Sequence, residues 1–178
     1  MTGRPSPEQR QAAFVEIVKE LAREDDFERL VAVIGRRACE LVDGDTAAIS
    51  LIEGDEIVYR GSWGFERAEA LTQRRKIVES RARRVLEHRR AYATGDMAAD
   101  PVWRDSALVT EHGFRAIIET PIVLHGEAQG VFGVLYRRPR DFSPEDVALL
   151  ASLAEHTALA LERTNRSEER RVGKECRL

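Results

Sequence analysis

The sequence predicts an α/β (α+β) fold: a central antiparallel sheet with terminal helices on one face and a pocket covered by loops and a short helix on the other. Apolar residues recur at helical spacing near both ends of the chain, whereas strand-like runs in the middle are joined by short turns. Adjacent hairpins imply an antiparallel sheet, and the helices must bury their apolar stripes against one face of it. A chain of 178 residues suffices for one such domain and is too short for two typical ones.

Three long helices are expected. The first begins at Ser6-Pro7-Glu8, where a capping hydroxyl precedes a proline at the first helical position and an acid near the positive helix end. The second begins at Asp25-Asp26, which can cap it, and ends near Gly44. The last begins at Ser143-Pro144-Glu145-Asp146, and its apolar pattern ends near Asn165.

Two hairpins are expected between these helices. The first joins residues 46–52 (TAAISLI) to 57–62 (IVYRGS), and the second joins residues 116–124 (AIIETPIVL) to 130–136 (GVFGVLY). Each connecting segment contains a glycine, which is typical of hairpin turns. Gly133 inside the last strand leaves room there for another backbone or a ligand.

The segment between the hairpins is expected to cover the second face of the sheet. Residues 63–76 look irregular, 78–86 fit a short helix with a basic outer face, 91–94 fit a short strand, and 95–113 form a long loop. Acids interleave with the basic residues of this helix, so we interpret its basic face as solvated and not as a nucleic-acid site.

Composition excludes several classes of function. The net charge is −3, so no overall positive charge attracts nucleic acid, and we expect no direct nucleic-acid binding. No apolar run approaches the roughly 20 residues of a membrane helix. The two cysteines, Cys39 and Cys176, are unlikely partners in a disulfide, and the start of the chain lacks the apolar stretch of a secretory signal. We therefore expect a soluble cytoplasmic protein without membrane insertion. Arginine far outnumbers lysine, which suggests a GC-rich bacterial genome.

The second hairpin and the segments beside it resemble a known family. The run GFRAIIETPI at residues 113–122, then Gly126-Glu127, then GVFGVL at 130–135 look like the core signature of GAF domains. FSPED at 142–146 resembles the start of that family's closing helix. The resemblance extends over residues 25–165, which we interpret as a GAF-like sensor domain.

GAF domains sense small molecules or pass conformational signals, and they commonly precede histidine kinases, cyclases, phosphatases or transcriptional regulators. The resemblance therefore implies a sensory or regulatory domain and not an enzyme, with a kinase, cyclase or DNA-binding output domain missing from this chain. Two alternatives stay open within the family: a ligand-free dimerisation module that only transmits strain, and a haem- or redox-sensing domain. An enzyme on the same fold is the third hypothesis.

Known ligand classes of the family fit this sequence poorly, so the cofactor is unknown. Arg137-Arg138 and Val147 replace residues of the motif found in some nucleotide-binding members, which argues against cyclic-nucleotide binding. Cys39 falls on an apolar helix stripe, where a buried small side chain is expected instead of a bilin linkage. Members that reduce methionine sulfoxide need several cysteines near the pocket. Of four histidines only His112 is placed to face a pocket, and solvent exposure is expected for each.

Seven residues are candidate ligand contacts. Five are aromatic residues near the expected pocket. The other two are charged: one directly precedes the strand-like run at residues 116–124, and one lies within it. Pockets are mostly apolar with a few placed polar groups, and a charge inside an apolar strand must face solvent, a partner or a ligand. The candidates are Tyr59, Trp63, Phe65, Trp103, Phe132, Arg115 and Glu119. No catalytic or metal-binding residue is predicted.

A homodimer joined through the terminal helices is also expected. The apolar stripes of these helices flank the domain core, so part of them would remain for a partner. The first helix contributes Phe14, Ile17 and Leu21, and the last contributes Leu150, Ala154, Ala158 and Leu161.

The two ends of the chain lie outside the expected sensor domain. Residues 1–24 form an N-terminal helical extension. The run RSEERRVGKEC from Arg166 to Cys176 resembles the in-frame translation of a common DNA-sequencing adapter, so we interpret residues 166–178 as a non-native tail. Cys176 and Lys174 are then expected to carry no function, and the natural chain is expected to continue beyond Asn165 into the output domain.

Overall fold

The computed structural model describes residues 6–65 and 74–175. The helices are α1 (Pro7–Leu21), α2 (Phe27–Val42), α3 (Arg83–His88), α4 (Ala107–Thr110) and α5 (Pro144–Glu175), with a 3-10 turn, η2 (Ile77–Glu79). The strands are β1 (Thr46–Glu53), β2 (Glu56–Trp63), β3 (Arg75–Lys76), β4 (Tyr92–Thr94), β5 (Ala116–Leu124) and β6 (Glu127–Tyr136). In these residues no helix combines the length and the apolar character needed to cross a membrane.

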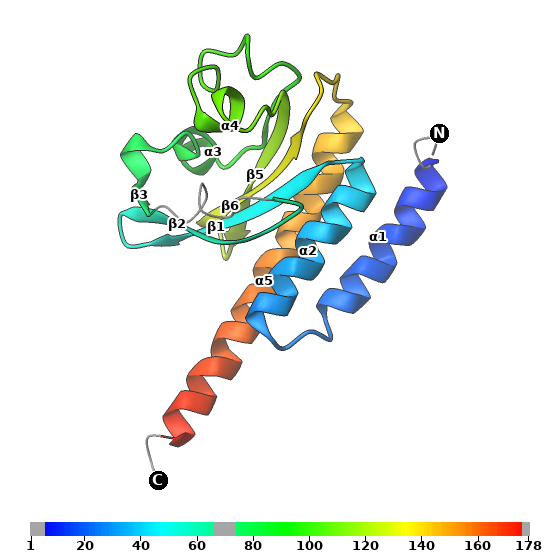
Figure 1. Cartoon of the computed structure of the whole chain (residues 1–178). Helices are drawn as coiled ribbons and strands as arrows, with labels where there is room; N and C mark the ends of the chain where they lie inside the picture. Colours follow the sequence, from blue (N-terminus) through cyan, green and yellow to red (C-terminus); the bar gives the residue numbers. More distant parts are fainter. Residues whose placement is uncertain (1–5, 66–73, 176–178) are drawn as a thin grey trace.

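The strands form one antiparallel sheet in the order β3-β2-β1-β6-β5-β4. Helices α2 and α5 lie against one face, and α1 packs on these two helices, whereas α3, α4 and their loops lie on the other face (Figure 1). This arrangement confirms the predicted α+β fold, with its central antiparallel sheet and its helices gathered on one side.

The predicted helix starts are confirmed by their caps. Ser6 and Gln9 form a reciprocal capping box at α1, and the Asp26 carboxylate accepts a hydrogen bond from the N–H of Arg29 at α2. The prediction for the end of the last helix is wrong, because α5 continues past Asn165 to Glu175. Arginine and glutamate are frequent in this extension and have high helix propensity, so a helix propagates there without an apolar stripe.

Both hairpin turns are tighter than the sequence runs indicated. The second turn comprises only His125 and Gly126, with φ of 51° and 79°, so β6 begins at Glu127 and not at Gly130. Two positive φ values define a turn whose twist matches that of the flanking strands. Residues 75–76, expected to be irregular, form a short edge strand against β2.

A bulge in β2 changes which face its side chains meet. Ile49 pairs with Gly61 but Ser50 pairs with Tyr59, so Arg60 is an extra residue. Tyr59 therefore stays on the face opposite the long helices, while Gly61 and Trp63 turn toward α2. A Cβ atom added to Gly61 would lie 2.5 Å from Val31 Cγ1, which shows how closely this part of β2 approaches the helix.

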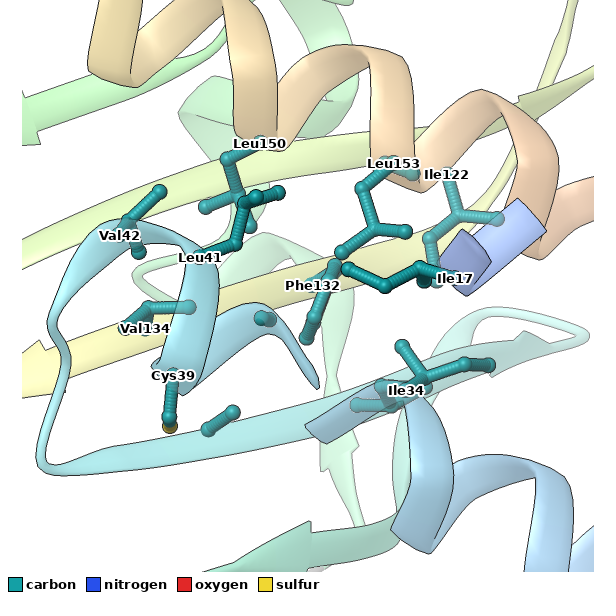
Figure 2. Packing of buried hydrophobic residues seen from close by; sticks show 14 of the residues in the cluster. Ile17, Ile34, Cys39, Leu41, Val42, Ile122, Phe132, Val134, Leu150 and Leu153 are labelled. Carbon is teal, nitrogen blue, oxygen red and sulfur yellow. The ribbon is translucent and has the colours of Figure 1, made fainter. Parts of the chain in front are cut away.

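The main core fills the space between the sheet and the long helices. Figure 2 shows Phe132 of β6 packed among Ile34 of α2 and Leu153 of α5, all three fully buried. Cys39 lies in the same cluster, and burial raises the pKa of its thiol to about 12. The interpretation of Cys39 as a buried apolar side chain is thus confirmed. Cys176 lies outside the described residues.

Helix α1 is anchored by a buried arginine. Arg10 Nη1 donates to Asp146 Oδ1 at 3.1 Å, and its Nη2 donates to Glu145 Oε2 at 2.8 Å. Asp146 also accepts hydrogen bonds from the N–H and hydroxyl of Ser143, so the same carboxylate caps α5. The arginine side chain is 9% exposed and the Asp146 side chain 1% exposed, so water screens this pair little.

We predict that Arg10→Met lowers the free energy of unfolding by about 3 kcal/mol, because it leaves a buried carboxylate without its cation. Urea unfolding followed by circular dichroism measures this change. The matched control is Lys19→Met on the same helix, whose ion pair with Glu16 is exposed and screened by water, so its loss should change stability much less. Equal effects of the two substitutions would contradict the anchoring role of Arg10.

Candidate functional site

A cavity of about 200 Å³ lies on the sheet face opposite the long helices. Its strand residues include Ile57 and Tyr59 of β2, Glu119 of β5 and Val131 of β6. The segments around α3 and α4 close it from the other side. One buried water requires only about 10–15 Å³ of such space, so the cavity has room for a molecule of several heavy atoms.

Asp100 organises the segment that carries Trp103. One of its carboxylate oxygens accepts the N–H of Val102 at 2.8 Å, and the other accepts the hydroxyl of Tyr92. Arg81 Nε donates to the carbonyl of Val102 at 2.9 Å. These bonds tie the segment to β4 and to the start of α3, and they hold the Trp103 ring buried in the cavity wall.

Helix α4 places two further polar side chains on the cavity. Ser106 occupies the N-cap position of α4, yet its hydroxyl makes no capping bond. His112 follows the helix, and its ring lies 5.3 Å from that of Phe65. Both residues line the cavity, so their polar atoms are available to an occupant.

Glu119 is the acidic residue of the cavity. It sits in the middle of β5, opposite Tyr92 of β4 and Gly133 of β6, and is 7% exposed. Burial raises the pKa of its carboxyl group from 4.5 to about 7. A Cβ atom added to Gly133 would meet nothing closer than 3.9 Å, so the glycine leaves space on the strand next to Glu119.

Four buried polar atoms on this one cavity lack a hydrogen-bond partner among the described residues. They are Trp103 Nε1, Ser106 Oγ, His112 Nε2 and Glu119 Oε2. Leaving one such atom unpaired costs about 1–3 kcal/mol, and native proteins have few of them. A bound molecule that hydrogen-bonds to this group would recover the cost, which makes the cavity the candidate site.

The structure brings three of the seven predicted site residues together on the cavity. Tyr59, Trp103 and Glu119 all line it. Phe65 lies beside it, stacked on Phe114 with ring centroids 5.6 Å apart and in contact with the His112 ring.

The other three predicted site residues lie elsewhere. Trp63 is turned toward α2 by the β2 bulge and is 43% exposed. Phe132 is fully buried on the opposite face of the sheet, in the main core. Arg115 Nη1 donates to the carbonyls of Phe114 and Val109, so its side chain stabilises the end of α4.

The site also contains residues that the sequence did not single out as contacts. Arg81 was interpreted as part of a solvated basic face, but it lines the cavity, and burial together with nearby Arg75 lowers its pKa. The neighbouring residue Ala82 is apolar, which is the sequence feature that could have indicated an inward-facing turn, and the structure shows that it is buried. No local pattern marks Ser106, because a serine before a helix normally caps it.

The histidines do not form a metal site in the part of the chain that the structure describes, where no group of three or more ligating side chains occurs. His112 faces the cavity as the sequence indicated. His88 and His125 are exposed as expected, whereas His112 and His156 are half-buried, and the His156 ring packs on Phe14 with centroids 5.6 Å apart.

Comparison with known proteins identifies related folds. A model of the GAF domain family matches residues 24–162. The GAF domain of a phosphoenolpyruvate-protein phosphotransferase from Coxiella burnetii is 18% identical with a TM-score of 0.82, over 93% of this chain and 99% of that one. The corresponding domain from Acinetobacter is 14% identical with a TM-score of 0.76, over 91% and 97%.

An enzyme is also among the similar structures. The free methionine-R-sulfoxide reductase of Neisseria meningitidis, solved in complex with its substrate, is 18% identical with a TM-score of 0.76, over 92% of this chain and 95% of that one. At this level of identity the likeness concerns the fold. No curated protein sequence matches this chain significantly.

We predict that Glu119→Gln stabilises the protein, and more so at pH 8 than at pH 4. The folded protein keeps a proton on Glu119 that the unfolded chain releases, so the carboxyl group lowers stability progressively as the pH rises from about 4.5 to about 7. The neutral amide avoids this penalty, which amounts to at most about 3 kcal/mol above pH 7. Urea unfolding at several pH values measures the difference.

Glu155→Gln on the exposed face of α5 is the control and should change stability by less than about 0.5 kcal/mol at every pH. If both variants followed the same pH profile as the parent protein, the buried environment of Glu119 would be refuted. From sequence alone, Glu119→Gln is expected to change ligand response more than stability; burial adds the stability effect.

Proposed function

This chain belongs to the GAF domain family, and we propose that it is a sensory domain that binds a small polar molecule in the cavity above β5. The observation that carries the proposal is the set of four buried polar atoms on Trp103, Ser106, His112 and Glu119 for which residues 6–65 and 74–175 provide no hydrogen-bond partner. An occupant that pairs with these atoms gains several hydrogen bonds whose desolvation cost the folded protein already bears.

Strand β5 is the route by which occupancy would reach the helices. Glu119 faces the cavity, while its neighbour Ile118 and the residue Ile122 belong to the core beneath α5. A ligand that binds one arrangement of β5 better than another shifts the population toward that arrangement. Helix α5 would then pass the change to an output domain, because GAF domains typically occur in multidomain proteins.

An enzymatic role is less well supported than sensing, in keeping with a family that is generally regulatory. One similar structure is a reductase, so an enzymatic role has to be considered. A cysteine-dependent reductase needs one thiol that attacks the substrate and another that resolves the resulting intermediate. Cys39 lies in the main core on the far side of the sheet, and its thiol has a pKa of about 12 because it is buried. It therefore offers no thiolate to the cavity.

We predict that freshly purified protein carries a small molecule, visible as a higher mass under native than under denaturing conditions in mass spectrometry. Trp103→Phe, which removes only the indole N–H and part of the ring, should reduce the retained fraction several-fold. Trp63→Phe is the matched control, since Trp63 lies outside the cavity. Equal native and denatured masses, with a rigid protein that binds no compound from a metabolite library, would support the ligand-free module instead.

We also propose that two copies associate through the terminal helices. The stripe residues expected at the interface are used internally: Ile17, Leu21, Leu150, Ala154, Ala158 and Leu161 are all buried in the protomer's own core. The apolar residues that these helices expose are instead Val15 on α1 and Leu159 on α5, at 43% and 56%. These two side chains support an interface at the helical layer.

We predict that Leu159→Glu dissociates the dimer, because it places a charge in an apolar contact. Multi-angle light scattering at micromolar concentration measures the mass. Val78→Glu is the control, since Val78 is 67% exposed on η2, on the other side of the molecule. A monomeric parent protein would contradict the proposed association, and a Leu159→Glu dimer would place it elsewhere.

The wider setting follows from the same proposal. We infer a sensor domain at residues 25–165 of a bacterial cytoplasmic protein, preceded by the helical extension 1–24. Residues 166–178 are proposed to be foreign to the gene.

A further inference from the structure

The cavity contains charged groups of both signs that do not pair with each other. Glu119 forms no ion pair within the described part of the chain, and burial is the cause that raises its pKa, with no arginine offsetting it. Arg81 lines the same cavity and hydrogen-bonds to a backbone carbonyl, but it forms no ion pair with any residue that the structure describes. Asp105 is the acid that acts on Arg81, but burial and the charge of Arg75 outweigh it and lower the pKa of the guanidinium. A ligand can therefore supply a closely paired counter-charge to both Glu119 and Arg81.

The rest of the lining defines what lies between these charges. Ile57, Ala82 and Val131 pack together as an apolar cluster and also contact the cavity. The indole N–H of Trp103 can only donate, so it requires an oxygen or another acceptor from an occupant. The site thus combines an acceptor, an apolar wall and donors.

We propose that the cavity binds a small aliphatic zwitterion, with a protonated amine at Glu119 and a carboxylate at Arg81 and the Trp103 N–H. This inference rests on the proposed sensory function and names the chemical class of its ligand. A zwitterion supplies an ion-pair partner to both side chains and buries no net charge, which is the condition under which buried ions are tolerated.

Other ligand chemistries satisfy fewer of these groups. An anion such as a phosphate would meet Arg81 but would require Glu119 to keep its proton, because the ionised carboxylate would be a like charge. A simple alkylammonium ion would meet Glu119 but would bring a positive charge into a cavity that also contains the Arg75 and Arg81 side chains. A neutral amide would pair with a protonated Glu119 but would offer Arg81 no charged group.

The state of Glu119 gives the binding a defined pH dependence. Five titratable or charged side chains lie around Glu119: Tyr92 on β4, Tyr59 on β2, Arg75 on β3, Arg81 before α3 and His112 after α4. Strand β6 contributes Gly133 and Val131, neither of which titrates. An ammonium group binds the ionised carboxylate, whose pKa is about 7. Affinity should therefore fall about tenfold per pH unit below that value.

The test uses fluorescence titration in the Trp63→Phe background, where Trp103 is the remaining tryptophan and reports on the cavity. The probes are ω-amino acids from glycine to 6-aminohexanoate, which vary the distance between the two charges, together with L-alanine, L-valine and L-norleucine. Matched carboxylates lack the amine, and matched alkylamines lack the carboxylate. We expect at least one amino acid to bind at pH 8 about tenfold or more tightly than both of its matched compounds.

Variants then assign each end of the ligand. Glu119→Gln should weaken binding about tenfold or more and remove its pH dependence between pH 5.5 and 8, whereas Glu155→Gln should change neither. Arg81→Gln should weaken the amino acid but not the matched amine.

Several results would overturn the inference. Equal binding of a carboxylate or an alkylamine, or affinity that rises as the pH falls, would show that one charge is not recognised. Binding of none of these probes would also overturn it. In that case a molecule retained in native mass spectrometry would leave the proposed sensory function standing, and the absence of one would remove both.

Discussion

The pleat of the antiparallel sheet is the constraint on which the rest of this molecule depends. Successive side chains of a strand point to opposite faces, so each strand contributes to two environments at once. On β5, Ile118 enters the helix-side core while Glu119 enters the cavity, and on β6 Phe132 and Val131 divide in the same way. The register between strands therefore decides which residues are available for binding and which stabilise the fold.

The two faces have opposite energetic roles. The helix side is a core of mainly aliphatic and aromatic side chains whose burial supplies most of the stabilisation. The cavity side carries a buried carboxylate and three other polar atoms that find no partner in the described part of the chain, and each of them lowers stability. Such a site persists only because the opposite face stabilises the same strands. The polar atoms that lack a hydrogen-bond partner in the protein alone are the ones with which a bound molecule gains the most binding free energy.

Helix α5 links these two environments to the ends of the chain. It packs along β5, directly behind the strand that carries Glu119, and its first turn supplies the carboxylates that hold Arg10 of α1. These contacts connect β5 to α5 through packed side chains and α5 to α1 through a buried ion pair. The short segments around α3 and α4 have little contact with the helical layer, so they can adapt to an occupant independently (Figure 1).

The sequence by itself determined the element order, the helix caps, the antiparallel sheet and the family, because these follow from local periodicity, turn chemistry and ordered motifs. It also placed Tyr59, Trp103 and Glu119 among the candidate contacts. Only the tertiary structure decided that Trp63 and Phe132 face the helices. Trp63 does so because of the bulge at Arg60. Phe132 does so because of the register of β6, which the almost continuous apolar run of that strand does not reveal. The convergence of Arg81, Ser106 and His112 on Glu119 likewise depends on how distant segments pack, which no spacing along the chain encodes.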